Sequence, residues 1–95
     1  MSDIINAAVD ALQAKIQGGF ESTAQFVLKG DGAIMVDAEG VRSGDEDADV
    51  TLSADADVFE AIFSGDMNPT AAFMTGKLKV EGDMGAAMKL ASFLG

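Results

Sequence analysis

The chain has 95 residues, 48% of them hydrophobic and only one a proline, which is typical of one globular domain, 1–95, with a single core. It contains no Cys or His, which excludes disulfides, thiol chemistry, zinc sites of the Cys/His kind and every His-dependent catalytic triad. Its formal net charge of −10 argues against nucleic acid as a partner, because phosphate binding needs a basic stripe.

The N-terminal region predicts an amphipathic helix over residues 3–17, which Ser2 or Asp3 can cap and Gly18-Gly19 ends. Its apolar side chains recur at helical spacing: Ile5, Val9, Leu12 and Ile16. An amphipathic helix of this kind packs its apolar stripe on a core.

Four strands are expected next. Residues 23–29 and 33–39 are rich in strand formers, and Gly30-Asp31-Gly32 between them predicts a hairpin. Residues 41–43 predict a weak third strand and residues 50–52 a short fourth one.

A helix is expected over residues 56–64, ended by Ser64-Gly65. Asp55 or Ser53 can cap its start, and an Asp57-x-x-Glu60 capping box offers a second start. Both alternatives place a broad apolar stripe on one side of the helix.

Three more elements are expected in the last third of the chain. Asn68 is a side-chain cap before proline at the first helical position, and Asp83 caps the last helix in the same way. The elements are a helix from Pro69 that ends before Gly76, a strand over 77–81 and a helix from 84 to about 94. The strand alternates apolar and polar residues, which is typical of a sheet with one solvated face.

Charge and methionine are distributed unevenly along the chain. Residues 1–60 hold thirteen acidic residues against three basic ones, whereas residues 61–95 hold three of each. Four of the six methionines also lie in this neutral part. The two parts of the chain are therefore suited to different surroundings.

The acidic run from Asp45 to Asp49 is the one candidate for a metal site. In a calcium loop that starts at Asp45, the sixth position would be Gly and the twelfth Glu, but here they are Val50 and Ala56. We therefore interpret the run as a solvated turn and expect no metal and no cofactor. Nothing in the sequence places two carboxylates together for acid–base chemistry, so we expect no enzyme activity.

Large apolar side chains are unusually dense in the second half of the chain. An ordinary core is one interpretation; a ligand site is the other, because methionine is flexible and adapts to changing partners. The candidate ligand-binding residues are Phe59, Ile62, Phe63, Met67, Phe73, Met74, Leu78, Met84, Met88, Leu90 and Leu94.

From about Asp49 to Leu90 the chain resembles the sterol carrier protein 2 domain family. The resemblance rests on Ala48-Asp49-Val50-Thr51-Leu52-Ser53, on Phe59-x-x-Ile62-Phe63-Ser64-Gly65, on Asn68-Pro69-x-Ala71-Ala72-Phe73-Met74-x-Gly76-Lys77-Leu78-Lys79-Val80-Glu81-Gly82-Asp83, and on Met84 to Leu90.

The resemblance implies an α+β fold: a twisted, mostly antiparallel sheet of about five strands with helices layered on one face. It also implies an apolar tunnel between sheet and helices for a fatty acid, acyl-CoA, phospholipid or sterol. The chain differs from the basic animal lipid-transfer members of the family in being strongly acidic. Because a large dry tunnel would be unstable in a small domain, we expect Met67, Met74, Met84 and Met88 to fill it in the empty form.

Two functions remain open on these grounds. The first is a cytoplasmic, non-enzymatic lipid carrier. Lys77, Lys79 or Lys89 could meet an acyl carboxylate at the mouth of its site, but exposure on the solvated face of a strand is the favoured interpretation of these lysines. The alternative is an interaction module whose apolar patch docks on a lipid-metabolising enzyme or on a second copy. No apolar run reaches the ~20 residues of a membrane span, so we expect no stable membrane insertion and at most transient contact with a membrane or an enzyme.

Overall fold

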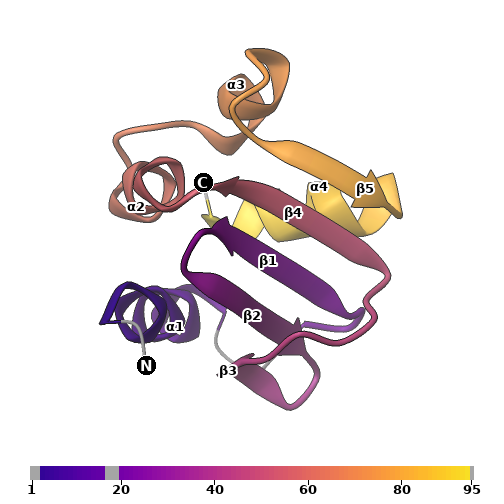
Figure 1. The fold of residues 1–95 in the computed structure, drawn as a ribbon. Helices are drawn as coiled ribbons and strands as arrows, with labels where there is room; N and C mark the ends of the chain where they lie inside the picture. The colour runs from indigo at the N-terminus through magenta and orange to yellow at the C-terminus, as the bar shows by residue number, and fades with distance from the viewer. Residues whose placement is uncertain (1–2, 17–19, 95) are drawn as a thin grey trace.

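The computed structural model describes residues 3–16 and 20–94, which form a sheet with helices packed on one of its faces (Figure 1). The elements in chain order are α1 (Asp3–Lys15), β1 (Ala24–Lys29), β2 (Gly32–Asp37), β3 (Gly40–Ser43), β4 (Val50–Asp55), α2 (Ala56–Ser64), α3 (Pro69–Met74), β5 (Lys79–Gly82) and α4 (Met84–Leu94). The expected α+β class and mostly antiparallel sheet are confirmed.

The sheet has five strands in the order β3-β2-β1-β4-β5. All neighbouring pairs are antiparallel except β1 and β4, which are parallel. The parallel pair arises because the chain returns from β3, at one edge, across the sheet to β4. Residues 44–49 make this crossing.

The acidic segment 44–49 is solvated, as expected, but it also covers the sheet face opposite the helices. The Gln25 amide donates to Asp45 Oδ1 at 2.7 Å, and the Gly44 N–H donates to the Ala33 carbonyl at 3.0 Å. Underneath, Met35 is only 1% exposed. A methionine on the outer face of the sheet is thus buried by a loop rather than by a helix.

The core lies between the sheet and the helices. Alternate strand residues point toward it, and the register aligns them in rows, for example Val36 beside Ala24 and Ala24 beside Val50. Phe26 of β1 meets Phe59 and Phe63 of α2 with ring centroids 5.5 and 6.3 Å apart. Full burial of such a side chain contributes ~1.5–3 kcal/mol, so this cluster fixes α2 on the sheet.

Most element boundaries agree with the sequence to within two residues. α1 ends at Lys15 rather than at residue 17, and the expected cap Ser2 and stop Gly18-Gly19 lie outside the described residues. β4 is longer than 50–52 because Ser53 and Ala54 continue its pairing with β1.

The sequence offers alternative caps for the start of α2. Ser53 is not one of them in the structure, because it lies within β4. Asp55 occupies the N-cap position, but its side chain makes no capping hydrogen bond. The second start, at Asp57, is wrong because this residue already lies inside the helix.

The caps of α3 and α4 are confirmed. Asn68 Oδ1 accepts from the N–H groups of Thr70 at 2.8 Å and Ala71 at 3.3 Å. Asp83 Oδ1 accepts from those of Gly85 at 2.9 Å and Ala86 at 3.3 Å. Each cap satisfies two backbone donors that the helix itself leaves unpaired.

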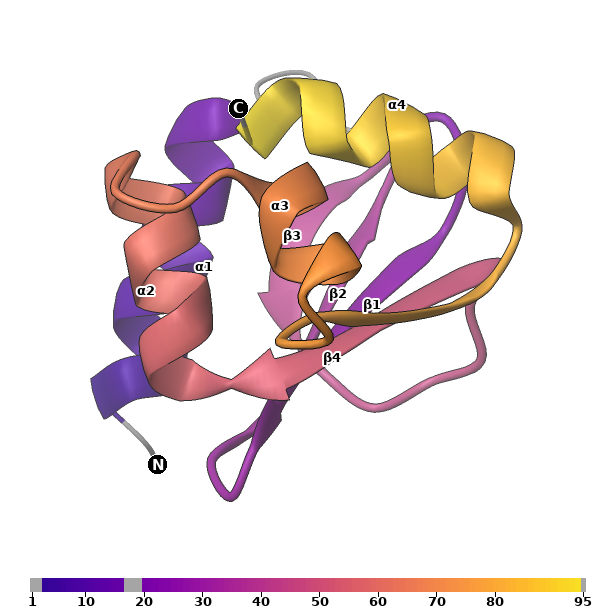
Figure 2. The ribbon, with the colours of Figure 1, turned by 90° about the horizontal axis from the view of Figure 1, so that it is seen from above.

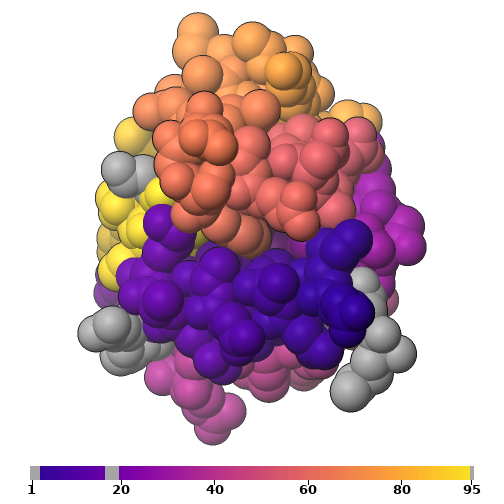
Figure 3. All heavy atoms as spheres, turned by 90° about the vertical axis from the view of Figure 1, so that its left-hand side faces the viewer, coloured from indigo at the N-terminus to yellow at the C-terminus, as the bar shows by residue number. Residues whose placement is uncertain are grey.

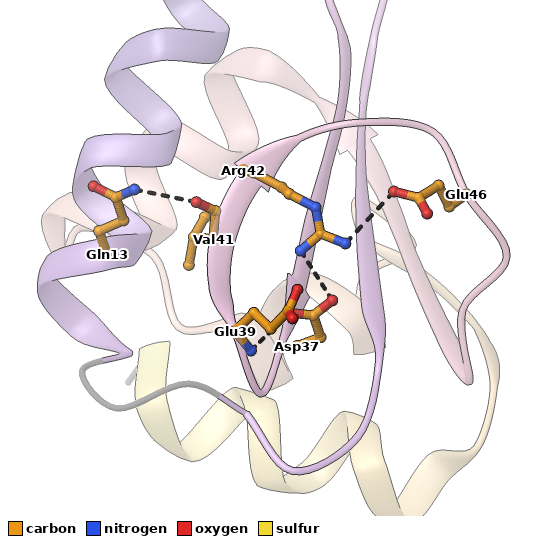
Figure 4. Close-up of polar contacts among 6 residues, drawn as sticks. All are labelled: Gln13, Asp37, Glu39, Val41, Arg42 and Glu46. Atoms are coloured by element: carbon orange, nitrogen blue, oxygen red, sulfur yellow. Dashed lines mark hydrogen bonds and ion pairs between the residues drawn. The ribbon is translucent and has the colours of Figure 1, made fainter.

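An ion-pair network joins β2, β3 and the crossing segment (Figure 4). The Arg42 guanidinium lies 2.9 Å from Asp37 Oδ2 and 3.5 Å from Glu46 Oε2. The hydrogen bond from Arg42, followed by one from the Glu39 N–H, lowers the pKa of Asp37, while partial burial opposes this. The Gln13 amide donates to the Val41 carbonyl at 3.1 Å and ties α1 to the same strand.

We expect the Asp37 carboxylate to make stability depend on pH in acid. Its pKa is lower in the folded chain than in the unfolded one, so its contribution is complete above the ordinary pKa and is lost as the pH falls through the folded value. Asp37→Asn should therefore lower the free energy of unfolding near neutral pH, and the difference from the wild type should vanish in strong acid. Urea titrations of both proteins across the acid range measure this; a pH-independent difference would contradict it.

Candidate functional site

An apolar groove lies between α3, β5 and α4, with β4 beneath it. It has a volume of about 210 Å³. Its base is formed by Leu52 and Val80, and its walls carry Phe73 from α3 and Met84 and Met88 from α4. We call this the α3–α4 groove. Figure 2 looks onto α3, with α4 along one side and β5 next to it.

Local periodicity explains why these side chains converge. Leu52 and Val80 are direct partners in the β4–β5 register and point to the same side of the sheet. On α4, the groove residues recur at helical spacing: Met84, Ala87, Met88, Ala91 and Leu94. The caps at Asn68 and Asp83 hold the two helices that form the walls.

The groove suits a hydrocarbon chain better than a polar substrate. No charged residue is among the described residues that line it, and Thr70 supplies the one hydroxyl of the lining. It therefore offers burial of apolar surface, and no acid or base of its lining could activate the Thr70 hydroxyl.

The three lysines of this region lie outside the groove lining. Lys77 and Lys79 are exposed, and Lys89 pairs with Glu21. The hydrogen bond from Lys89 lowers the pKa of the Glu21 carboxyl. Lys77 and Lys79 therefore lie at the exposed surface, as the favoured interpretation of the sequence predicts.

The eleven candidate residues are divided between different places. Five line the α3–α4 groove: Phe73, Leu78, Met84, Met88 and Leu94. Ile62 and Leu90 are fully buried core residues, and Met67 packs half-buried against that core. Phe59 and Phe63 line a different cleft. Met74 lies on the outer side of α3 and is 79% exposed. The structure does not gather the set in one tunnel.

The expectation that four methionines fill the interior is wrong for at least two of them. Met74 is 79% and Met88 73% exposed, and Met84 is about half exposed. The interior is already filled by rigid side chains such as Phe26 and Phe59. Met84 and Met88 lie at the surface along the groove, Met74 lies on the exposed side of α3, and Met67 packs half-buried against the core.

A second cleft separates α1 from α2, on the side of the molecule shown in Figure 3. Its volume is about 260 Å³, and it is lined by Ala7, Ala11, Phe59 and Phe63 among others. It also includes Glu60, whose carboxylate would repel an acyl carboxylate. Although this cleft is the larger one, its charge makes it the poorer site for a fatty acid.

Several groove residues are not predicted from the sequence, chiefly Ala87 and Ala91 of α4 and Pro69 of α3. The two alanines stand four residues apart, in line with Met84 and Met88. Small residues within a stripe of large ones leave room above them, and this spacing could have indicated the groove. For Pro69 the sequence predicts only a place at the start of α3, directly after the Asn68 cap.

Two further properties concern the described part of the chain. None of its helices is long and apolar enough to cross a membrane. Within the same residues, no group of three or more acidic side chains is placed to hold a metal ion.

Comparisons with a family model and with curated proteins agree with one another. The model of the SCP-2 sterol transfer family matches residues 3–95. Hydroxysteroid dehydrogenase-like protein 2 of Xenopus tropicalis is 48% identical over 79 residues, which are 75% of this chain and 19% of that protein. Sterol carrier protein 2 of Rattus norvegicus is 44% identical over 77 residues, 79% of this chain and 13% of that protein. The chain thus spans a fifth or less of the length of these relatives.

A solved structure shows the same fold. Sterol carrier protein 2 of Aedes aegypti, in complex with the C16 fatty acid palmitate, superposes with a TM-score of 0.79. The match covers 99% of this chain and 96% of that one, at 19% sequence identity. At 19% sequence identity, the similarity shows that the two proteins share a fold and nothing more.

Proposed function

Because the chain belongs to the SCP-2 sterol transfer family, we propose that it is a non-enzymatic lipid carrier that holds one acyl chain in the α3–α4 groove. The observation that carries the proposal is the uncharged, almost entirely apolar lining of this groove. The palmitate bound by the Aedes aegypti protein supports a single-chain fatty acid as the ligand. The proposal also includes three larger ligands: acyl-CoA, phospholipid and sterol.

The size of the groove fits a carrier that opens around its ligand. Pockets for small molecules usually enclose ~300–1,000 Å³, more than the 210 Å³ of the groove. An empty apolar cavity costs about 24 cal/mol per Å³, so ~300 Å³ would cost about 7 kcal/mol. That is about half or more of the ~5–15 kcal/mol that stabilises a domain. A small groove in the empty state avoids this cost, and movable Met84 and Met88 allow it to widen.

Lipid extraction from protein purified from its own cells, followed by mass spectrometry, tests the proposal. We expect one acyl-chain lipid per chain, with native mass spectrometry showing the loaded monomer. A lipid-free dimer would overturn the proposal and favour the interaction module instead.

Filling the groove should weaken binding. We expect Ala91→Phe to lower the affinity for palmitate about tenfold or more, because the ring occupies space that the chain would otherwise fill. The measurement is a fluorescent fatty-acid displacement titration.

Ala11→Phe is the matched control, since it makes the same change in the cleft between α1 and α2. It should leave the affinity within about twofold, a change of about 0.4 kcal/mol. If Ala11→Phe weakens binding and Ala91→Phe does not, the ligand occupies the other cleft.

A further inference from the structure

The edge of the sheet at β5 has no partner strand in the described part of the chain. β5 pairs with β4 alone there, and Figure 2 looks onto its other edge. The Asp83 N–H donates to the Asp49 carbonyl at 2.8 Å. Because backbone groups alternate in direction along a strand, the N–H and C=O of Val80 then point away from β4. An open edge of this kind is a template for pairing with another strand.

The charged residues of β5 are ordered so that the strand complements itself when it is reversed. Lys79 and Glu81 flank Val80 and are exposed on the sheet face opposite the helices. Neither forms an ion pair within residues 3–16 and 20–94. Lys77 and Asp83, just beyond the two ends of the strand, repeat this order at equal distances from Val80. Two antiparallel copies centred on Val80 would thus place a lysine opposite a carboxylate at every charged position.

We propose that the protein forms a two-fold symmetric dimer through β5, which joins two five-stranded sheets edge to edge. Val80 of each copy exchanges both of its backbone hydrogen bonds with the partner's Val80, and Lys79 lies opposite the partner's Glu81. The charged residues then occupy the non-hydrogen-bonded positions, where opposing Cα atoms are only about 4.5 Å apart. Opposite charges at facing positions stabilise strand pairing. This interface goes beyond the proposed carrier function.

The dimer brings the two α3–α4 grooves together. Antiparallel pairing of identical strands places the two-fold axis perpendicular to the sheet, so the helices of both copies lie on one side of it. Val80 forms part of the base of the groove, and this base continues across the axis into the partner's Val80. A single groove of 210 Å³ is smaller than most ligand pockets. The second copy therefore extends the apolar surface on which a ligand can lie.

The dimer also covers apolar side chains that a single copy leaves exposed. Figure 1 shows α3 beyond β5, where this strand starts. Because the two β5 strands run in opposite directions, α3 of one copy lies at the end of the partner's β5, where the partner's α4 begins. A group of exposed apolar residues on neighbouring elements indicates a contact surface. The large exposed side chains that this arrangement brings together are Phe73, Met74, Met84 and Met88.

Charge and interface size set the strength of the dimer. Residues 61–95 hold three acidic and three basic residues, so the net charge of −10 arises from the other part of the chain. A strand of four residues makes a small interface, and interfaces below about 1,200 Å² belong to transient complexes. We therefore expect a dimer at high concentration that dissociates at the low concentrations of native mass spectrometry, where the loaded monomer remains the expected species.

Sedimentation velocity at rising concentration tests the proposal, and the wild type should dimerise reversibly. In the dimer, Lys79→Glu places carboxylates opposite each other at two positions, and Glu81→Lys does the same with ammonium groups. Each variant should raise the Kd of the dimer about tenfold or more. Mixed together, the two variants should associate as the wild type does, because each lysine then faces a carboxylate of the other variant.

The controls separate edge pairing from net charge and from ligand binding. Lys29→Glu makes the same charge change at an exposed position of β1, which pairs with β2 and β4, and should leave the Kd within about twofold. The NMR resonance of the Val80 amide should shift with concentration in the wild type but not in Lys79→Glu. Both β5 variants should bind palmitate in dilute solution as the wild type does, so loss of the dimer is distinguishable from loss of the carrier function.

Two results would overturn the dimer through β5. One is wild-type protein that stays monomeric up to millimolar concentration. The other is a dimer whose Kd neither β5 variant changes, which would assign the contact to the exposed side chains of α3 and α4 without the strand.

Discussion

Gly82→Ala is expected to destabilise the protein by about 3 kcal/mol or more, because the new methyl group has no space and alanine is strained in the backbone conformation that glycine adopts here. Gly82 has a φ of +101°, and a Cβ at this position would lie 2.2 Å from the Asp49 carbonyl oxygen. The same oxygen accepts a hydrogen bond from the Asp83 N–H at 2.8 Å. Because the obstacle is backbone, no side-chain rotation can relieve the overlap.

Gly76→Ala provides the matched control. Gly76 also has a positive φ, +81°, but no atom lies within 4 Å of the position that a Cβ would take. Only the conformational cost of about 1–2 kcal/mol is expected there. Denaturant unfolding of both variants separates backbone strain from overlap. Equal losses of stability in the two variants would show that contact with Asp49 is unimportant.

The consequence of Gly82→Ala should extend to the groove. Gly82 ends β5, and Asp83 immediately caps α4, so this junction sets the angle at which α4 leaves the sheet. Movement of the Asp49 carbonyl also disturbs the pairing of Val50 with Gly82. We therefore expect the folded fraction of Gly82→Ala to bind palmitate more weakly, whereas Gly76→Ala retains binding.

The parts of the fold that could be predicted are those set by nearby residues. Asn68 before Pro69, and Asp83 before Met84, each act on N–H groups two and three residues ahead, so sequence alone locates both helix starts. The hairpin at Gly30-Asp31-Gly32 is local in the same sense.

The parts that could not be predicted depend on contacts between distant residues. The return of the chain from β3 to β4 over Met35 depends on Gln25 meeting Asp45, and no periodic pattern records that contact. Its acidic residues were correctly expected in solvent, but their role in covering the sheet was not expected.

Only part of the groove lining could be predicted from the sequence, because the rest again depends on packing between distant residues. On a helix that is apolar all round, periodicity cannot tell which face meets the core, so Leu90 and Met88 looked alike in the sequence. Packing separates them: Leu90 is fully buried, whereas Met88 remains at the edge of the groove. Large apolar side chains were found from sequence, but the space between them was created by Ala87 and Ala91.

Saturating palmitate is expected to raise the melting temperature strongly. A ligand at 100 times its Kd adds about 2.7 kcal/mol to stability, which for a domain of this size corresponds to a shift of about 10–20 °C. The measurement is a calorimetric scan at increasing palmitate. Ala91→Phe serves as the control and should show a much smaller shift at the same concentrations. Absence of a shift in the wild type would contradict the carrier function.

The dependence on acyl length tests how the stabilisation arises. Each buried CH₂ contributes about 0.8 kcal/mol, so affinity should rise about fourfold per methylene until the groove is full and then level off. No charged residue is among the described residues that line the groove, so a fatty alcohol should bind about as tightly as the acid of equal length. A strong preference for the acid would instead place its carboxylate on a lysine such as Lys77. The length at which affinity levels off measures how far the groove widens around the ligand, because the empty groove, at 210 Å³, is smaller than most ligand pockets.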